Sequence, residues 1–213
     1  MTTRTARVWL ALLSLLLAAP NGLAAQQSTI LFLGDSLTAG LGLDPQEAFP
    51  ALIQERIDEL GWPFRVVNAG SSGETSAGGL RRVDWLLRSP ARVLVLELGA
   101  NDGLRGTPVE STHANLQAII DKARQARPGI EIVVAGMMVP PNLGVLYSNE
   151  FRQMFPTLAA SNATELIPFL LDGVGGRPEY NLADGIHPNA DGHRIVAANV
   201  WTVLEPVLSR LIR

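Results

Sequence analysis

The chain has 213 residues, a formal net charge of −3 and no cysteine. This length predicts a single domain with a substantial hydrophobic core. The small negative charge gives no electrostatic reason to expect a nucleic-acid partner. The lack of cysteine excludes disulfides, thiolate nucleophiles and cysteine metal ligands.

The first 25 residues follow the three-part plan of a secretory signal peptide. Arg4 and Arg7 precede an apolar run over residues 8–19, and the small residues Ala24 and Ala25 offer a cleavage site. A permanent membrane anchor is the alternative, but this run is shorter than the ~20 residues that a spanning helix needs. We therefore expect residues 1–25 to be a signal peptide and residues 28–213 to form the folded domain. The mature protein should be periplasmic or secreted, without a stable membrane anchor.

From residue 28 onward, the hydrophobic pattern alternates between strand-like and helix-like segments. In chain order it predicts a strand at 29–33, a helix at 49–60, a strand at 65–67, a helix at 77–87, a strand at 92–98, a helix at 108–127, strands at 130–135 and 166–169, and a helix at 189–211. Thr107 is the expected cap of the third helix, and Pro206 is expected to kink or break the last one. Apolar strands separated by helices predict a parallel sheet covered on both faces.

Polar and glycine-rich segments follow these strands. They are residues 34–38, 68–76, 99–106 and 136–147, together with the turn before His187. Because open parallel sheets bind ligands at the carboxyl ends of their strands, these segments are the expected location of a site.

Two short motifs at opposite ends of the chain supply the parts of serine hydrolysis. Ser36 lies in the sequence GDSLT directly after the first predicted strand, and Asp184 and His187 lie in the sequence DGIHP. A serine hydroxyl needs a base within hydrogen-bond reach, and a carboxylate can orient that base. The pattern predicts a hydrolase with Ser36 as nucleophile, His187 as base and Asp184 as orienting acid. The alternative for Ser36 is a turn or helix-capping serine.

Four blocks in order resemble the SGNH (GDSL) hydrolase family, and within it the periplasmic thioesterase I, arylesterase and lysophospholipase branch. They are GDSL at 34–37, NAGSSGETS at 68–76, GAND at 99–102 and DGIHPN at 184–189. The resemblance extends from about residue 30 to the C-terminus. It implies a three-layer α/β/α sandwich, similar to flavodoxin, with a five-stranded parallel sheet and no cofactor.

The resemblance also implies an oxyanion hole with three donors. They are the backbone N–H of Ser36, the backbone N–H of Gly73 and the side-chain amide of Asn101. Glycine suits such a site because it has no Cβ to obstruct the substrate. The ordinary alternatives are a tight turn at Gly73, with Gly70 as a rival for the register, and a capping role for Asn101.

A metal site built from Asp35, Asp102, Asp184 and His187 is the other chemistry that these segments suggest. No HExxH or calcium-loop spacing is present, and a carboxylate cluster would not need Ser36. We therefore expect no metal.

The resemblance implies an exported serine esterase or thioesterase. Its substrates would be acyl-CoA-like thioesters, aryl esters or lysophospholipids, with an acyl-enzyme on Ser36. Residues 137–147 form an apolar, proline-stiffened segment that would contact the acyl chain through Leu143, Val145 and Leu146. Residues 137–139 could instead complete a core strand.

Two other functions remain open. A carbohydrate O-acetylesterase would share the same four blocks, and a non-catalytic exported binding module would keep the fold with a decayed site. The second is disfavoured because every expected catalytic residue is present. The expected partner is a small ester or thioester, not a nucleic acid, and a monomer is the working expectation.

Overall fold

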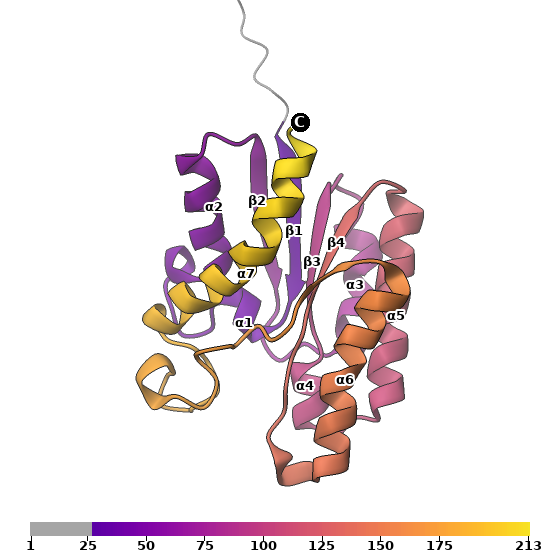
Figure 1. Ribbon diagram of the computed structural model, residues 1–213, viewed down its shortest axis with the longest axis vertical. Coiled ribbons are helices and arrows are strands. Elements are labelled where there is room, and N and C mark those ends of the chain that lie inside the picture. Colours follow the sequence, from indigo (N-terminus) through magenta and orange to yellow (C-terminus); the bar gives the residue numbers. More distant parts are fainter. Residues whose placement is uncertain (1–26) are drawn as a thin grey trace, which may run out of the picture.

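The computed structural model describes residues 27–213 (Figure 1). The predicted signal peptide, residues 1–25, lies outside these described residues. Within residues 27–213, none of the helices combines the length and the apolar character needed to cross a membrane.

Five parallel strands form one sheet in the order β2-β1-β3-β4-β5. The strands are β1 (Ser28–Gly34), β2 (Phe64–Gly70), β3 (Val93–Glu97), β4 (Glu131–Ala135) and β5 (Glu165–Ile167). β3 is buried along its whole length, as expected for a strand covered on both faces. This strand order is that of flavodoxin, so the predicted fold class is confirmed.

Helices cover the sheet in two layers (Figure 1). α2 (Phe49–Glu59) and α7 (Ala190–Leu211) pack together on one face, and α3 (Ser76–Leu86), α5 (Val109–Ala126) and α6 (Val145–Asn162) form the other layer. The short helices α1 (Ser36–Ala39) and α4 (Ala100–Leu104) follow β1 and β3 directly, and the remaining helical turns are the 3₁₀ segments η1 (Pro45–Glu47), η2 (Pro141–Leu143) and η3 (Pro178–Tyr180).

Some predicted boundaries differ from the structure. The cap of α5 is Pro108 and not Thr107, which lies one residue earlier, where its N–H donates to the carbonyl of Asp102 and closes the turn after α4. α7 continues through Pro206, which is exposed, so that water can satisfy the carbonyl group that proline leaves without a donor. α6 was not predicted, and its first turn includes the end of the expected loop 136–147.

The order of the strands reverses between β1 and β3. Connections from these two strands therefore leave toward opposite faces and open a crevice at their carboxyl ends. Ser36 and Asn101 lie in the first turns of α1 and α4, immediately after these two strands. The topology thus brings two of the predicted site residues to the same edge of the sheet.

Candidate active site

The turn that carries Ser36 is built by its neighbours. Asp35 caps α1, and its carboxylate accepts a hydrogen bond of 2.9 Å from the backbone N–H of Leu37. A Cβ atom on Gly34 would collide with the side chains of Thr38 and Glu97, so only glycine fits at the end of β1. Ser36 is consequently the first helical residue, close behind the strand and largely buried.

His187 connects Ser36 with Asp184. The Nε2 atom of His187 lies 2.9 Å from the Ser36 Oγ atom, and its Nδ1 atom lies 2.7 Å from Oδ2 of Asp184. Because a carboxylate can only accept, Nδ1 carries the hydrogen and Nε2 presents its lone pair to the serine hydroxyl. This is the arrangement in which a histidine can act as a general base.

A local turn fixes Asp184 against His187. Its other oxygen, Oδ1, accepts the backbone N–H groups of Ile186, at 2.9 Å, and His187, at 3.0 Å, while Gly185 adopts a φ of +70° between them. Hydrogen bonds from the backbone and ring N–H groups of His187, and then from Ile186, lower the pKa of Asp184 to about 2. The carboxylate therefore stays ionised at neutral pH, and the 45% exposure of its side chain favours the charged form as well.

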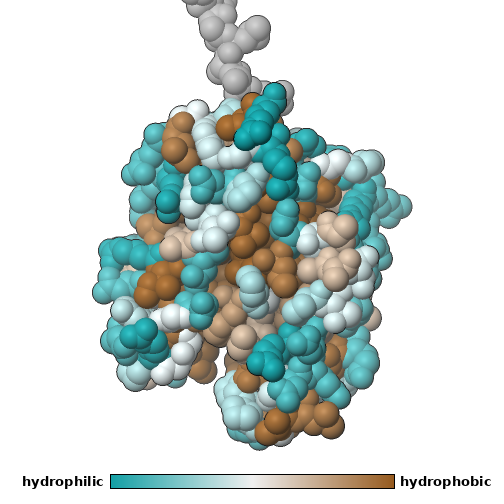
Figure 2. Space-filling view, in the orientation of Figure 1, coloured by the Kyte–Doolittle hydropathy of each residue, from teal (hydrophilic) through white to brown (hydrophobic). Residues whose placement is uncertain are grey.

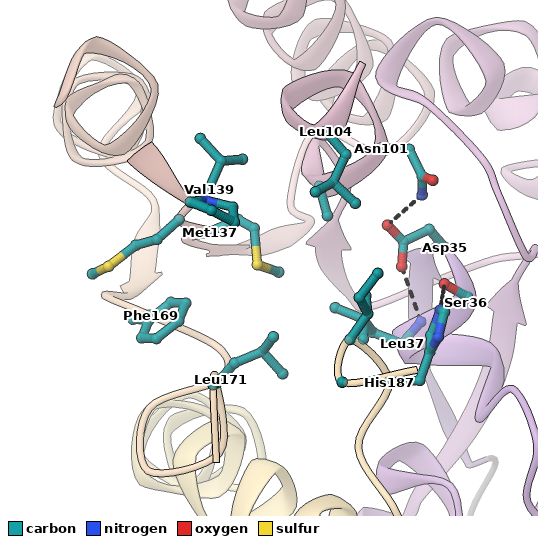
Figure 3. A pocket seen from close by; sticks show the side chains of 17 residues that line it. Asp35, Ser36, Leu37, Asn101, Leu104, Met137, Val139, Phe169, Leu171 and His187 are labelled. Carbon is teal, nitrogen blue, oxygen red and sulfur yellow. Dashed lines mark hydrogen bonds between the residues drawn. The ribbon is translucent and has the colours of Figure 1, made fainter. Parts of the chain in front are cut away.

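Asn101 reaches the same region from α4. Gly99, with a φ of +119°, turns the chain out of β3 so that Asn101 faces the nucleophile turn. Its Nδ2 atom donates a 3.0 Å hydrogen bond to Oδ2 of Asp35 (Figure 3). A carboxamide has two N–H groups, so one of them remains for another acceptor. Asn101 lines a cavity together with Ser36 and His187.

Gly73 lies at the outer side of this arrangement. It has a φ of +78°, and its carbonyl group accepts a 3.1 Å hydrogen bond from the Arg105 guanidinium. Its backbone N–H donates no hydrogen bond to another residue in the described range, yet Gly73 is not part of the cavity lining. The structure thus brings Ser36, Asn101 and His187 into the cavity wall, with Asp184 bound to His187 and Gly73 beside Arg105.

Arg82 ties the ends of two strands to the loop that contains Gly73. Its guanidinium donates to the carbonyl groups of Ala69, at 2.6 Å, and Gly34, at 3.3 Å, and its Nε atom lies 2.8 Å from Oε1 of Glu74. Glu74 follows Gly73 directly. Arg82 on α3 therefore fixes the loop after β2 relative to the nucleophile turn.

A cavity of about 490 Å³ opens beside Ser36 and His187 (Figure 3). Its wall comes from five separate segments and is mainly apolar. It is formed by Leu37, Ala100, Leu104, Met137, Met138, Val139, Pro140, Phe169, Leu171, Gly175, Gly176, Gly185 and Ile186, in addition to the polar residues Asp35, Ser36, Asn101 and His187. Its size and lining suit an apolar group attached to the reacting centre.

The residues expected to contact the acyl chain lie outside this cavity. Leu143, Val145 and Leu146 do not line this cavity and are 43%, 67% and 74% exposed. The chain turns away after Pro140 into η2 and α6, which carries these three side chains to an outer tip. Figure 2 shows hydrophobic side chains at that lower tip, below the site. Residues 137–139, which the sequence also allowed as the end of a strand, line the cavity instead.

The sequence analysis did not identify the residues that complete the cavity. Leu104 lies on α4, and Phe169 and Leu171 follow β5, so their apolar character resembled that of ordinary core residues. A stronger signal was available for Glu97, an acidic residue within a strand that is otherwise apolar and fully buried. Acidic side chains are seldom fully buried, so an acid in an apolar strand indicates a candidate functional residue.

Comparison with known proteins agrees with this geometry. Residues 32–195 match the GDSL-like Lipase/Acylhydrolase family. The chain is 44% identical to the esterase TesA of Pseudomonas aeruginosa over 86% of this chain and 91% of that protein. It is 35% identical to thioesterase 1/protease 1/lysophospholipase L1 of Escherichia coli over 87% of this chain and 88% of that one. The crystal structure of the psychrotrophic esterase EstA from Pseudoalteromonas sp., inhibited by monoethylphosphonate, is 34% identical, covers 86% of this chain and 100% of its own, and superposes with a TM-score of 0.80. The chain therefore belongs to the GDSL-like lipase/acylhydrolase family.

Proposed function

We propose that this protein is a serine esterase and thioesterase that hydrolyses carboxylic esters and thioesters through an acyl-enzyme on Ser36. The observation that carries the proposal is the 2.9 Å contact between Ser36 Oγ and His187 Nε2 at the wall of an apolar cavity. A free serine hydroxyl attacks slowly at neutral pH, and a base at this distance removes that limit.

The reaction follows from the hydrogen bonds. The Ser36 oxygen attacks the acyl carbon while His187 takes the hydroxyl proton, and the ionised Asp184 stabilises the imidazolium that forms. His187 then gives the proton to the departing alcohol or thiol, and the acyl group remains on Ser36. In the second half, His187 takes a proton from water, the resulting hydroxide attacks the acyl carbon, and the carboxylic acid leaves as the proton returns to Ser36.

Charge that develops on the carbonyl oxygen needs donors. The second N–H of Asn101 and the backbone N–H groups of Ser36 and Gly73 are the proposed set. Asn101 is supported by its place in the cavity wall, and Gly73 by a backbone N–H without a partner among the described residues.

The acyl group of the substrate would occupy the cavity, because that is where apolar walls meet the nucleophile. The leaving group would lie toward solvent, so its size and chemistry are less restricted than those of the acyl group. The names of the relatives, which include an esterase, an arylesterase and a thioesterase 1/protease 1/lysophospholipase L1, support aryl esters, thioesters such as acyl-CoA and lysophospholipids as substrates of this chain.

A fluorophosphonate probe tests the proposal. The purified protein from residue 26 onward should be labelled covalently, and Ser36→Ala should abolish both labelling and hydrolysis of p-nitrophenyl and coenzyme A esters. Labelling that persists in Ser36→Ala would contradict the proposal, and no labelling of either protein would favour a binding module. Hydrolysis confined to acetyl esters, including acetylated polysaccharide, would favour a carbohydrate O-acetylesterase.

We also propose that the protein is exported and acts as a monomer. The N-terminal segment with Arg4 and Arg7 before an apolar run supports export. Mass spectrometry of the protein from the periplasmic or extracellular fraction should show a new N-terminus after residue 24 or 25. An intact N-terminus in the cytoplasmic fraction would contradict export, and light scattering decides the oligomeric state.

A further inference from the structure

Glu97 is a buried acid that the proposed reaction does not use. It is the last residue of β3, it is 1% exposed, and it pairs in register with Gly34 at the end of β1. Its side chain therefore lies beneath the turn that carries Ser36. Among residues 27–213 no cation forms an ion pair with it, although an unpaired buried carboxylate is costly.

One oxygen of Glu97 holds both ends of the nucleophile segment. Oε2 accepts the backbone N–H of Asp35 at 3.2 Å and the hydroxyl of Thr38 at 2.7 Å. Asp35 precedes Ser36, and Thr38 lies two residues after it. A single carboxyl oxygen therefore fixes the backbone on both sides of the nucleophile.

The other oxygen of Glu97 identifies its protonation state. Oε1 is buried and accepts no hydrogen bond from the described residues, which is unfavourable for an ionised carboxylate. Neighbouring Asp35 has the opposite pattern, because its two oxygens accept from Leu37 N–H, at 2.9 Å, and Asn101 Nδ2, at 3.0 Å. The acid that accepts on both oxygens is the one suited to carry the charge, and the acid with an unused oxygen is the one suited to carry the proton.

Burial and the nearby Asp35 charge raise the pKa of Glu97 well above its usual value, while burial raises the pKa of Asp35 only to about 6. Because the charges of two neighbouring buried carboxylates repel, the two groups do not both ionise readily, and the proton stays on the more deeply buried Glu97.

We infer that Glu97 is a positioning residue of the active site: a neutral carboxylic acid that clamps the segment Asp35–Thr38 through Oε2. Asp35 in turn holds the Asn101 amide. The clamp therefore sets the positions of the nucleophile and of one proposed oxyanion donor. This role rests on the proposed function, and it adds a residue that lies outside the four blocks recognised in the sequence.

Two substitutions distinguish the clamp from a space-filling role. Glu97→Gln keeps a carbonyl oxygen for Asp35 N–H and Thr38, and its amide is neutral like the protonated acid. Its kcat on p-nitrophenyl acetate should stay within about threefold of the unsubstituted protein. Glu97→Leu has a side chain of similar size but no oxygen to accept hydrogen bonds from Asp35 N–H and Thr38. Its kcat should therefore fall about 10- to 100-fold with KM nearly unchanged. Val95→Ala, on the same face of β3, should lower stability without changing kcat below its melting temperature.

An infrared difference spectrum tests the proton directly and does not depend on activity. Subtracting Glu97→Gln from the unsubstituted protein at neutral pH should reveal the C=O stretch of a protonated carboxylic acid. A carboxylate band in its place would overturn the inference, even if Glu97→Leu fails to fold. Unchanged kcat in Glu97→Leu, or equal losses in Gln and Leu variants, would overturn it as well. If the unsubstituted protein hydrolyses no ester, the proposed function fails, and the spectrum still decides the state of Glu97.

Discussion

The ring of His187 lies within hydrogen-bond distance of the Ser36 hydroxyl, 2.9 Å away, although 151 residues separate them in the sequence. Two segments at the carboxyl edge of the sheet carry these residues. One follows β1, and the other precedes α7 and is pinned by a backbone hydrogen bond of 2.7 Å from Leu182 N–H to the His187 carbonyl. The contact therefore depends on the closure of the whole fold and not on a local motif.

Replacement of Asp184 should damage catalysis without unfolding the protein. In Asp184→Asn the carbonyl oxygen can still accept the backbone N–H groups of Ile186 and His187, but the new NH₂ group faces Nδ1 and favours the wrong tautomer of the ring. We expect kcat to fall by about 10³- to 10⁴-fold. Steady-state kinetics measure the loss of kcat, and circular dichroism shows whether the variant remains folded. Asp191→Asn, another exposed acid, is the matched control, and equal kcat in both variants would argue against the assigned role.

Removal of the Asn101 amide should affect turnover more than binding. Its free N–H is placed to meet charge that develops only in the transition state, so Asn101→Ala should lower kcat by about 10²- to 10³-fold and leave KM within a few-fold. Asn149→Ala, exposed on α6, serves as control. A rise in KM with unchanged kcat would show that Asn101 binds the ground state instead.

Acyl-chain preference should respond to the cavity and not to the outer tip. Leu171→Trp fills space in the cavity wall, so kcat/KM for long-chain p-nitrophenyl esters should fall about tenfold relative to the acetyl ester. Leu146→Asp lies outside the lining and should leave this ratio unchanged. A chain-length series on both variants makes the comparison. The opposite pattern would restore Leu143, Val145 and Leu146 as acyl contacts.

Acid should destabilise the fold through His193. This residue on α7 is 1% exposed, and its Nδ1 atom accepts the backbone N–H of Phe49 at the start of α2, at 3.0 Å. Burial, and then the charge of His187, lower its pKa from 6.5 to about 4. The unfolded chain therefore binds a proton below pH 6.5 while the folded protein does so only near pH 4, and stability falls as the pH drops through this window.

The expected loss at His193 is about 2 kcal/mol between pH 7.5 and pH 5. Asp35 acts in the opposite direction, because its pKa is raised in the fold. Urea unfolding of the unsubstituted protein and of His193→Asn at both pH values isolates the histidine contribution, since the Asn oxygen can still accept the Phe49 N–H. Identical pH dependence in the two proteins would exclude His193 as the source.

Strand pattern, element order and the identities of the reactive side chains could be predicted from the sequence. Buried parallel strands are apolar throughout, so β1, β3 and β4 are evident from composition alone. The pairing of Asp184 with His187 is also local, because a turn of four residues is enough to bring a carboxylate to the ring. These features depend on neighbours in the chain and are therefore visible in it.

Tertiary structure alone decided which apolar residues line the cavity and which lie outside it. Leu104, Phe169 and Leu146 are all apolar, and their place relative to the cavity depends on how α4, the loop after β5 and the start of α6 pack. The protonation state of Glu97 could not be predicted from the sequence either. It depends on the burial of the side chain beneath the nucleophile turn and on the nearby Asp35 carboxyl group. Apolar character is a property of a residue, whereas a cavity or the protonation state of a buried acid is a property of residues brought together from distant parts of the chain.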